Sequence, residues 1–486
     1  MEPISRREAL RLGLLGTASI AVGAVGMTWT QGSSEGSSAS LRGGGVTPFR
    51  EPSTLRSQNG LLRVELRAAE RELEVAGRRA RVLSYADELP SPTWRIRAGD
   101  TLHVRLANDL SAPTNLHFHG LHVSPAGNGD NPFVSVLPGE VFEYDVQVPA
   151  DHPAGLFWYH PHLHGSVADQ VFGGLYGAIV VEDDTSNGDE RVLVVSDISL
   201  QRDGTVRRAS TVEQMMGREG ELLVVNGLAQ PQIEVRPGGT ERWLVLNACT
   251  SRFLDLALPG HDLRVVGMDS GRYRDPLPVK DVLLAPGNRA DLLVTATGGT
   301  GRLQSLGHDR GSPMMAMMGG RGADPSGPAL LAVVEPTGAD APVDAPSVPG
   351  TVQRDLRGLE PATLRQITFT MSMGMGMGRM SVGFDGQPFD HTRTDQSVET
   401  DAVEEWTIRN PTPMDHPFHL HVWPMQVIDD NGSTPAEPTW QDVVNVPADG
   451  YVTVRIRFDD FTGRTVYHCH ILDHEDAGMM GVVGVV

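Results

Sequence analysis

Histidine, cysteine and methionine gather near the C-terminus in the stretch YHCHILDHEDAGMM, residues 467–480. If YHCH lies on a β-strand, successive side chains point to opposite faces, so His468 and His470 share one face and Cys469 occupies the other. A cysteine thiolate joined by a histidine and a methionine forms the ligand set of a blue-copper electron-transfer centre. We therefore expect one short strand to serve two metal sites, with Cys469 covalently linked to both neighbouring histidines.

The elements that position these residues belong to a repeated unit. One block occurs three times, as RIRAGDTLHVRLAND (95–109), EVRPGGTERWLVLNA (234–248) and, more weakly, SVETDAVEEWTIRNP (397–411). A later block also occurs three times, as VLPGEVFEYDVQVP (136–149), LLAPGNRADLLVTA (283–296) and NVPADGYVTVRIRF (445–458). Alternating apolar and polar residues around Pro/Gly turns are typical of strands, so three such units predict three β-sandwich domains.

Four His-x-His pairs occupy matched positions in the first and third repeats, and they are His117 and His119, His160 and His162, His419 and His421, and His468 and His470. The middle repeat has Leu256 and Leu258 in place of one pair, and a lone His308 that we interpret as a surface or vestigial residue. Two pairs from each outer domain fit a metal cluster held between those domains. Unrelated buried or surface histidines are the alternative, which the matched positions disfavour.

The motifs HFHG, WYHPH, HPFHLH and HCHILDHEDAGM resemble the four copper-binding motifs of the multicopper oxidases, close to the bacterial laccases and copper-efflux oxidases. The resemblance implies an all-β fold of three cupredoxin-like Greek-key β-sandwiches that holds four copper ions. It also implies which residues hold each copper: His416, Cys469, His474 and Met479 the type 1 ion, with Met480 the alternative to Met479 if the register shifts; His117 and His419 the type 2 ion; and His119, His160, His162, His421, His468 and His470 the type 3 pair.

The implied reaction is the one-electron oxidation of a reductant at the type 1 copper, with transfer through Cys469 to the cluster and reduction of O2 to water. Because this reduction consumes protons, a buried cluster needs carboxylates that deliver them. Glu475 and Asp130 match acids that copper-efflux oxidases place near the cluster, although both residues could equally be solvated loop residues. Asp415, directly before His416, is expected near the substrate edge.

Two methionine-rich segments, PMMAMMG at 313–319 and MSMGMGMGRM at 371–380, hold nine of the eighteen methionines. Thioethers are soft ligands that prefer Cu(I), and similar loops in copper-efflux oxidases gather cuprous ions. A low-complexity loop without function is the alternative. The expected reductants are therefore phenols, aromatic amines and Cu(I).

The domain boundaries that follow from the repeats are 56–185, 186–345 and 346–486. Residues 1–30 carry a twin arginine ahead of a mildly apolar run and resemble a bacterial Tat export signal, which implies a periplasmic, cell-envelope or secreted protein. This run is too short for stable membrane insertion. Residues 31–55 begin with a Ser/Gly-rich stretch and are predicted to be a disordered linker.

A net charge of −21 argues against nucleic acid and anionic membranes as partners. With two cysteines, a disulfide framework is excluded, and Cys249 is predicted to be a buried core residue. A three-domain chain closes its own interdomain site, so we expect a monomer. Two other functions are compatible with parts of this pattern: a copper-sequestering resistance protein, and a three-domain relative that has lost its copper, against which the complete ligand set argues.

Overall fold

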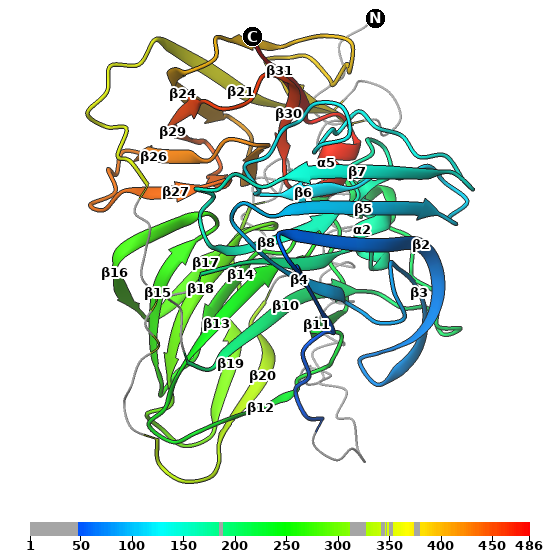
Figure 1. Ribbon diagram of the computed structural model, residues 1–486, viewed down its shortest axis with the longest axis vertical. Coiled ribbons are helices and arrows are strands. Elements are labelled where there is room, and N and C mark those ends of the chain that lie inside the picture. Colours follow the sequence, from blue (N-terminus) through cyan, green and yellow to red (C-terminus); the bar gives the residue numbers. More distant parts are fainter. Residues whose placement is uncertain are drawn as a thin grey trace, which may run out of the picture. The chain divides into compact units, whose positions relative to one another are not determined.

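Three cupredoxin-like Greek-key β-sandwiches, each built from two sheets, form the described part of the chain, as predicted (Figure 1). The computed structural model describes residues 47–183, 188–311, 327–341, 346, 348, 353–373 and 380–486. Three short helices lie within these ranges: α2 (Val167–Gly173), α3 (Thr211–Met216) and α5 (Leu472–Asp476). No helix in the described ranges is long and apolar enough to cross a membrane.

The first sandwich, blue and cyan in Figure 1, joins the sheet β1-β4-β9-β8-β6 to the sheet β3-β2-β5-β7. Alternate residues of both sheets point inward and form one buried core, which includes Leu66, Trp94 and Leu106. Its strands are β1 (Thr54–Arg56), β2 (Leu61–Val75), β3 (Arg78–Ser84), β4 (Ser91–Arg97), β5 (Thr101–Asn108), β6 (His117–His119), β7 (Val141–Gln147), β8 (Gly155–His160) and β9 (Gly177–Glu182).

The second sandwich, mostly green in Figure 1, joins the sheet β11-β10-β13-β18-β15-β16 to the sheet β12-β20-β19-β14-β17. Its strands are β10 (Glu190–Ile198), β11 (Leu222–Val225), β12 (Gln232–Val235), β13 (Thr240–Asn247), β14 (Leu254–Ala257), β15 (Asp262–Met268), β16 (Gly271–Val279), β17 (Asp281–Leu284), β18 (Arg289–Thr295), β19 (Gly301–Ser305) and β20 (Ala329–Pro336). Leu256 and Leu258, which replace a histidine pair, lie in its apolar core.

The third sandwich joins the sheet β22-β21-β24-β29-β26-β27 to the sheet β23-β31-β30-β25-β28. Its strands are β21 (Thr363–Met373), β22 (Met380–Phe384), β23 (Gln396–Val398), β24 (Ala402–Asn410), β25 (His416–Leu420), β26 (Met425–Asp430), β27 (Thr439–Gln441), β28 (Val443–Val446), β29 (Gly450–Phe458), β30 (Gly463–Cys469) and β31 (Met480–Val485). Cys469 and Met479 belong to its core.

The repeats detected in the sequence correspond to one strand pattern used three times. Strands β5, β13 and β24 each pair in parallel with one neighbour and antiparallel with another, and each ends in a buried asparagine. The amide Nδ2 of that asparagine donates to two backbone carbonyls at Asn108 and Asn247 and to three at Asn410, and its Oδ1 accepts from the backbone N–H two residues on in all three. The asparagine thus fixes the start of the loop that leads to the next strand, which in the outer domains carries histidines.

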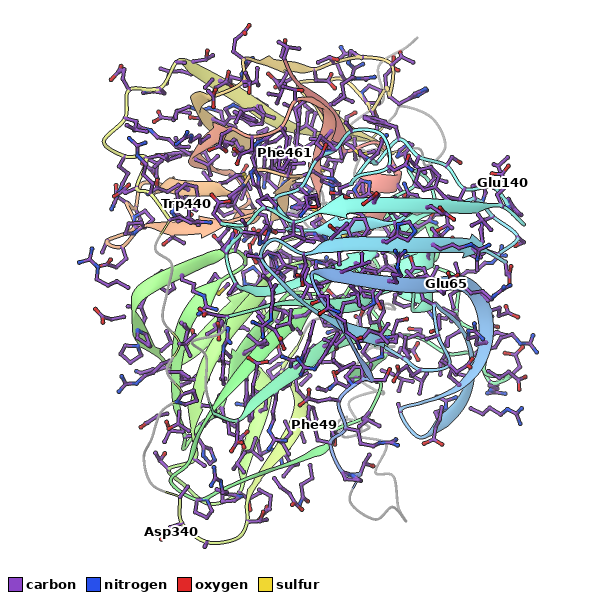
Figure 2. All side chains as sticks on the ribbon, in the orientation of Figure 1. Phe49, Glu65, Glu140, Asp340, Trp440 and Phe461 are labelled. Carbon is purple, nitrogen blue, oxygen red and sulfur yellow. The ribbon has the colours of Figure 1, made fainter. Side chains whose placement is uncertain are left out.

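The predicted disordered linker 31–55 is wrong for residues 47–55. Pro48 forms a bridge to Gln232 of β12, and Phe49, labelled in Figure 2, packs against the core of the second sandwich. Thr54–Arg56 then adds the parallel edge strand β1 to the first sandwich. Backbone pairing and the apolar side chain of Phe49 hold residues 47–55 against the sandwiches. The polar composition of the stretch did not indicate these contacts.

Several sequence predictions lie outside the described residues. They are the export signal, the rest of the linker to residue 46, the segment 313–319, and residues 374–379 of the second methionine-rich segment. The flanks of that second segment lie on β21 and β22, which pair antiparallel from Phe369 and Phe384 to Met373 and Met380.

We expect Asn247→Ala to lower the free energy of unfolding by about 1–3 kcal/mol, because two buried carbonyls, those of Arg252 and Leu284, lose their donor. Urea denaturation of the copper-free protein measures this change. Asn128→Ala, at an exposed position, is the control and should leave the midpoint unchanged. An unchanged midpoint for Asn247→Ala would show that the loop does not depend on this residue.

Candidate metal centre

Strands β25 and β30 divide two groups of ligand-type side chains between their two faces. The strands pair antiparallel, with His419 opposite His468 and Phe418 opposite Cys469. Alternation places His419 and His468 on one face, while Cys469 lies on the other with His416, which is three residues before His419. The face assignment predicted from the sequence is therefore confirmed.

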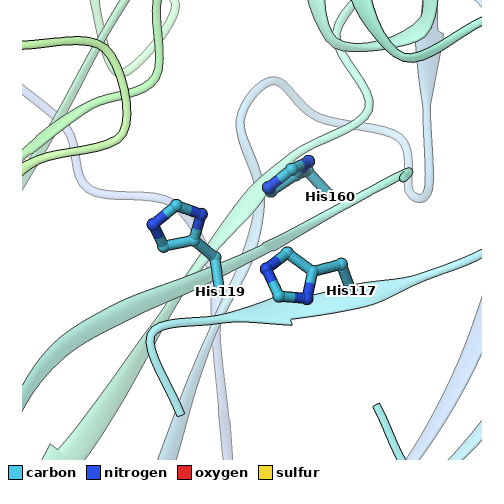
Figure 3. Close-up of side chains that lie close together, drawn as sticks. All are labelled: His117, His119 and His160. Carbon is cyan, nitrogen blue, oxygen red and sulfur yellow. The ribbon is translucent and has the colours of Figure 1, made fainter. Parts of the chain in front are cut away.

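The first domain supplies the facing histidines through the strand pair β6 and β8. His117 lies opposite His160, and His119 lies opposite Trp158. Figure 3 shows the rings of His117 and His119 rising from the same strand, with the ring of His160 beside them. The ring centroids of His117 and His119 are 5.4 Å apart, and those of His117 and His160 are 5.3 Å apart.

The second histidine of the other three pairs lies just beyond its strand, because β8, β25 and β30 end at His160, Leu420 and Cys469. His162, His421 and His470 nevertheless join the same cluster. The Nε2 atom of His162 is 3.0 Å from Nε2 of His468 and 3.1 Å from Nε2 of His421. Strand alternation alone therefore does not account for the position of these three rings.

All eight histidines are buried, and they form one group between the first and third domains. Seven of them present at least one ring nitrogen without a hydrogen-bond partner, and these atoms are His117 Nε2, His119 Nδ1, His160 Nε2, His162 Nδ1, His419 Nε2, His421 Nδ1 and both nitrogens of His470. Leaving so many buried polar atoms without partners is costly. A bound cation satisfies them, so the residues fit a metal cluster.

The outer nitrogens of several rings are held by hydrogen bonds that orient the inner ones. The Nδ1–H group of His160 donates to the Pro161 carbonyl at 2.8 Å, and that of His419 donates to the Asp442 carbonyl at 2.7 Å. Each bond leaves Nε2 as the free, unprotonated nitrogen. Burial lowers the pKa of His160 to about 3, so its imidazole is neutral at ordinary pH and able to bind a metal.

Three Nε2 atoms converge most closely, those of His162, His421 and His468, which are 3.0–3.2 Å from one another. Burial lowers the pKa of His162 and His421, and their positive forms would also repel one another. Three rings whose Nε2 atoms lie this close together are a ligand set for one metal ion.

A second group lies on the opposite face of β25 and β30. The Cys469 Sγ atom is 3.4 Å from His416 Nδ1 and 3.8 Å from His474 Nδ1. Burial raises the pKa of the Cys469 thiol and lowers that of His474 to about 4. The buried group is therefore neutral without a metal, and a thiolate there requires a compensating cation.

The two adjacent methionines after α5 and its turn, Met479 and Met480, pack in different places. The backbone N–H of Met479 donates to the His474 carbonyl, and the Met479 carbonyl accepts from the Cys469 N–H. Met479 shares the core that contains Cys469, whereas Met480 packs with Val466 and Val482 in a different cluster. Met479 is thus the methionine that lies beside the cysteine.

Two predicted carboxylates are buried against the histidine cluster, so neither is a solvated loop residue. Both oxygens of Asp130 lie 2.9 Å from His117 Nδ1, and burial raises the pKa of Asp130 to about 7. Glu475 lies between two rings, with one oxygen 3.1 Å from His468 Nδ1 and the other 3.5 Å from His162 Nε2.

Asp415 and His308 lie in contact with each other. Asp415 is buried, and its oxygens accept from Asn445 Nδ2 and the Ala448 N–H, while its place near the substrate edge stays a prediction. His308 is half-buried, stacks on Phe253 and contacts Asp415 through Nε2 at 2.9 Å. This contact joins the second and third domains, which a surface residue would not do.

Sequence reasoning missed Asp442 and Arg289, which lie directly beside the cluster. Asp442 Oδ1 is 3.0 Å from His119 Nε2, and Arg289 of the middle domain pairs with both Asp442 oxygens. One signal was available. In the later repeat block, the middle copy has Arg289 where the first and third copies have Val141 and Gly450. The middle copy thus differs by a charged residue.

Three sequence profiles match this chain, and each is described as "Multicopper oxidase": they cover residues 67–186, 158–302 and 357–486. The multicopper oxidase mco of Staphylococcus aureus is 25% identical over 445 residues, which are 88% of this chain and 90% of that protein. A laccase of Haloferax volcanii is 26% identical over 464 residues, covering 82% of this chain and 77% of that protein.

The described domains also resemble a solved structure, the multicopper oxidase from Campylobacter jejuni, which is described as a metallo-oxidase. It is 28% identical, with a TM-score of 0.81, and the match covers 91% of this chain and 96% of that one. The likeness therefore spans all three sandwiches and both groups of ligand-type residues.

We expect copper to raise the thermal unfolding temperature of the metal-free chain, because it binds the folded cluster and not the unfolded chain. A hundredfold excess over Kd contributes about 2.7 kcal/mol per site. Calorimetry with and without copper measures the shift. His391→Ala, at an exposed position, should keep the full shift, whereas His162→Ala should reduce it. An equal shift for both variants would contradict the cluster.

Proposed function

The chain belongs to the multicopper oxidase family, and we propose that it couples the one-electron oxidation of a reducing substrate to the four-electron reduction of O2 to water. We assign His416, Cys469, His474 and Met479 to a type 1 copper, His117 and His419 to a type 2 copper, and the remaining six cluster histidines to a type 3 pair. When bound, these four ions would supply the electron transfer and the O2 chemistry, while the chain supplies ligands, orientation and exclusion of water.

The observation that carries this proposal is the placement of two ligand sets on opposite faces of β30. Cys469 belongs to one set, and its covalent neighbours His468 and His470 belong to the other. A short stretch of backbone therefore joins the two sets. A copper store needs no such connection, so the arrangement favours an oxidase over a sequestering protein.

Glu475 and Asp130 are the residues that we propose to hold protons for O2 reduction. Each is buried and touches a cluster histidine, Glu475 at His468 and Asp130 at His117. The two Glu475 oxygens face two cluster rings, one at 3.1 Å from His468 Nδ1 and the other at 3.5 Å from His162 Nε2, which places a carboxyl group where it can pass protons to the cluster. Asp130 is partly fixed, because it also accepts from the Phe118 N–H.

A cavity of about 220 Å³ is lined by residues of the first and third domains, His162 among them. Phe133, Phe389, Val466 and Met480 are among its lining residues. Apolar walls suit the passage of O2, a small apolar molecule, toward the cluster. This cavity supports the assignment of O2 as the electron acceptor.

We expect Cys469→Ser to abolish both the blue absorbance and turnover while the fold stays intact, because the substitution removes the thiolate ligand and the link to the cluster. Visible absorbance, oxygen consumption and circular dichroism measure the three effects. Cys249→Ser is the matched control, since Cys249 is equally buried but lies in the second domain. A blue Cys469→Ser protein would refute the assignment.

The companion variants His119→Ala and His421→Ala should keep the blue absorbance and lose O2 reduction, because these residues belong to the cluster face. Loss of the blue absorbance in these variants would show that the two faces had been exchanged. Copper analysis of the parent protein separates the oxidase from a store, because the oxidase saturates near four ions per chain.

The reductants that we propose are Cu(I) together with phenols and aromatic amines. The Nε2–H group of His474 donates to the Met215 carbonyl at 3.0 Å, so helix α3 covers the edge of the ring through which electrons would enter. A phenol cannot hydrogen-bond to that nitrogen while α3 is in place, which favours a small metal ion. The methionine-rich segments and the metallo-oxidase description of the Campylobacter jejuni protein also support Cu(I).

We expect Met375→Leu combined with Met377→Leu to lower kcat/KM for Cu(I) by roughly tenfold, on the scale of weakening a metal site, while kcat/KM for a phenol is unchanged. These positions spare the strand pairs at 371–373 and 380, which a deletion of 371–380 would break. Met268→Leu, in the second sandwich, is the control. Unchanged efficiency with Cu(I) would favour a simple laccase.

A further inference from the structure

The middle domain, which has none of the eight cluster histidines, places a buried arginine directly beneath the cluster. Arg289 begins β18 and has an exposed fraction of 1%. Its Nη1 atom donates to Asp442 Oδ1 at 2.5 Å and its Nη2 atom to Oδ2 at 2.6 Å. Its Nε–H group donates to the Leu156 carbonyl of the first domain at 3.0 Å. One side chain thus contacts all three sandwiches.

Asp442 in turn contacts two cluster histidines, each through a different oxygen. The carboxylate Oδ1 lies 3.0 Å from His119 Nε2, and the backbone carbonyl accepts from His419 Nδ1–H at 2.7 Å. The oxygens of a carboxylate paired with a guanidinium act as hydrogen-bond acceptors. The proton of His119 is therefore held on Nε2, and its free nitrogen is Nδ1, the atom that lacks a partner.

A second carboxylate fixes the position of this pair. Asp269 accepts from the backbone N–H groups of Arg289, Asp442 and Val443 at 2.9–3.2 Å. Asn288 donates to the same carboxylate and to the Val443 carbonyl. The strand segment that carries Asp442 is thus held in place by the middle domain, at the backbone and at the side chain.

The fit is tight on both sides of the guanidinium. A Cβ on Gly120, which follows His119 at φ +82°, would lie 2.4 Å from Arg289 Nη2. A Cβ on Gly287, at φ +88°, would lie 2.8 Å from His470 Nε2. Both positions therefore need glycine, because Gly120 of the first domain packs against Arg289 and Gly287 of the middle domain packs against His470 of the third.

Building on the proposed function, we infer that Arg289 is a positioning residue for the copper cluster: it fixes Asp442, which holds His119 in the tautomer that presents Nδ1 and orients His419. Asp442 itself is not an open ligand, because both carboxylate oxygens are engaged by the arginine. The middle domain accordingly contributes to metal retention without supplying a ligand.

The test compares Arg289→Gln, Asp442→Asn and the double variant. We expect each single variant to keep the blue absorbance of the type 1 site and to hold the cluster coppers about 10–100-fold more weakly, as for other residues that orient metal ligands. Copper per chain after dialysis against graded chelator, and the electron paramagnetic resonance signal of the type 2 ion, are the measurements. Arg289→Lys keeps the positive charge but cannot donate to both Asp442 oxygens as the guanidinium does. We therefore expect an intermediate loss of cluster copper.

The double variant shows whether Arg289 acts on the cluster through Asp442 or independently of it. If Arg289 acts through Asp442, the double variant loses no more copper than the weaker-binding single variant. Additive losses, or normal retention in Arg289→Gln, would overturn the inference. Should Arg289→Gln fail to fold, Arg289→Lys and Asp442→Asn decide the question by the same measurements.

Arg242→Gln is the matched control, because Arg242 forms a buried two-point pair with a carboxylate, Asp291, in the same domain, and its second carboxylate partner is Glu190 rather than Asp442. It should lower stability and leave cluster copper unchanged. An equal loss of cluster copper in Arg242→Gln would show that Arg289 has only a general structural role. The proposed function fails separately, if the parent protein itself is not blue or does not bind four coppers.

Discussion

The two-residue period of a β-strand is the constraint on which the metal centre depends. On β25 and β30, residues one apart point to opposite sides, so one pair of strands serves two separate ligand sets. Any insertion of one residue in either strand would exchange the faces and destroy both sets together. The remaining fold protects this register. Buried asparagines at Asn108 and Asn410 fix the loops before the histidine strands, and the turn after α5 returns Met479 to the side of Cys469.

In a buried cluster of eight imidazoles, the hydrogen-bond acceptors around each ring set its tautomer and so determine which nitrogen can bind a metal. Different acceptors do this for different rings: a backbone carbonyl for His160 and His419, and a carboxylate for His117 and His119. The carboxylates are themselves buried and need compensation, which Arg289 provides for Asp442. The middle domain therefore takes part in the site through electrostatics, although its own counterpart strands carry leucine where the outer domains carry histidine.

The parts of the molecule that could be predicted from sequence are those governed by local periodicity. The repeats predicted three sandwiches, and the spacing of His468 and Cys469 predicted which face of β30 each would occupy. Contacts between distant segments could not be predicted this way. Arg289 and Asp442 are separated by 153 positions, and neither lies in one of the four histidine motifs. The position of His308 against Asp415 and the pairing of residues 47–55 with the first and second domains also arise from packing between segments that no local pattern connects.

The division of the cluster between the first and last domains sets the order of events during biosynthesis. His162 and His468, whose nitrogens are 3.0 Å apart, are separated by 306 positions. A ribosome completes the first and second sandwiches while the strand β30 is still unmade, and domains fold as units from the N-terminus. The four histidines of the first domain are therefore exposed to solvent or to other metals until the third domain, with β30, has been synthesised and has folded. Correct metal occupancy is thus decided after synthesis, by the availability of copper in whichever compartment the finished chain meets it.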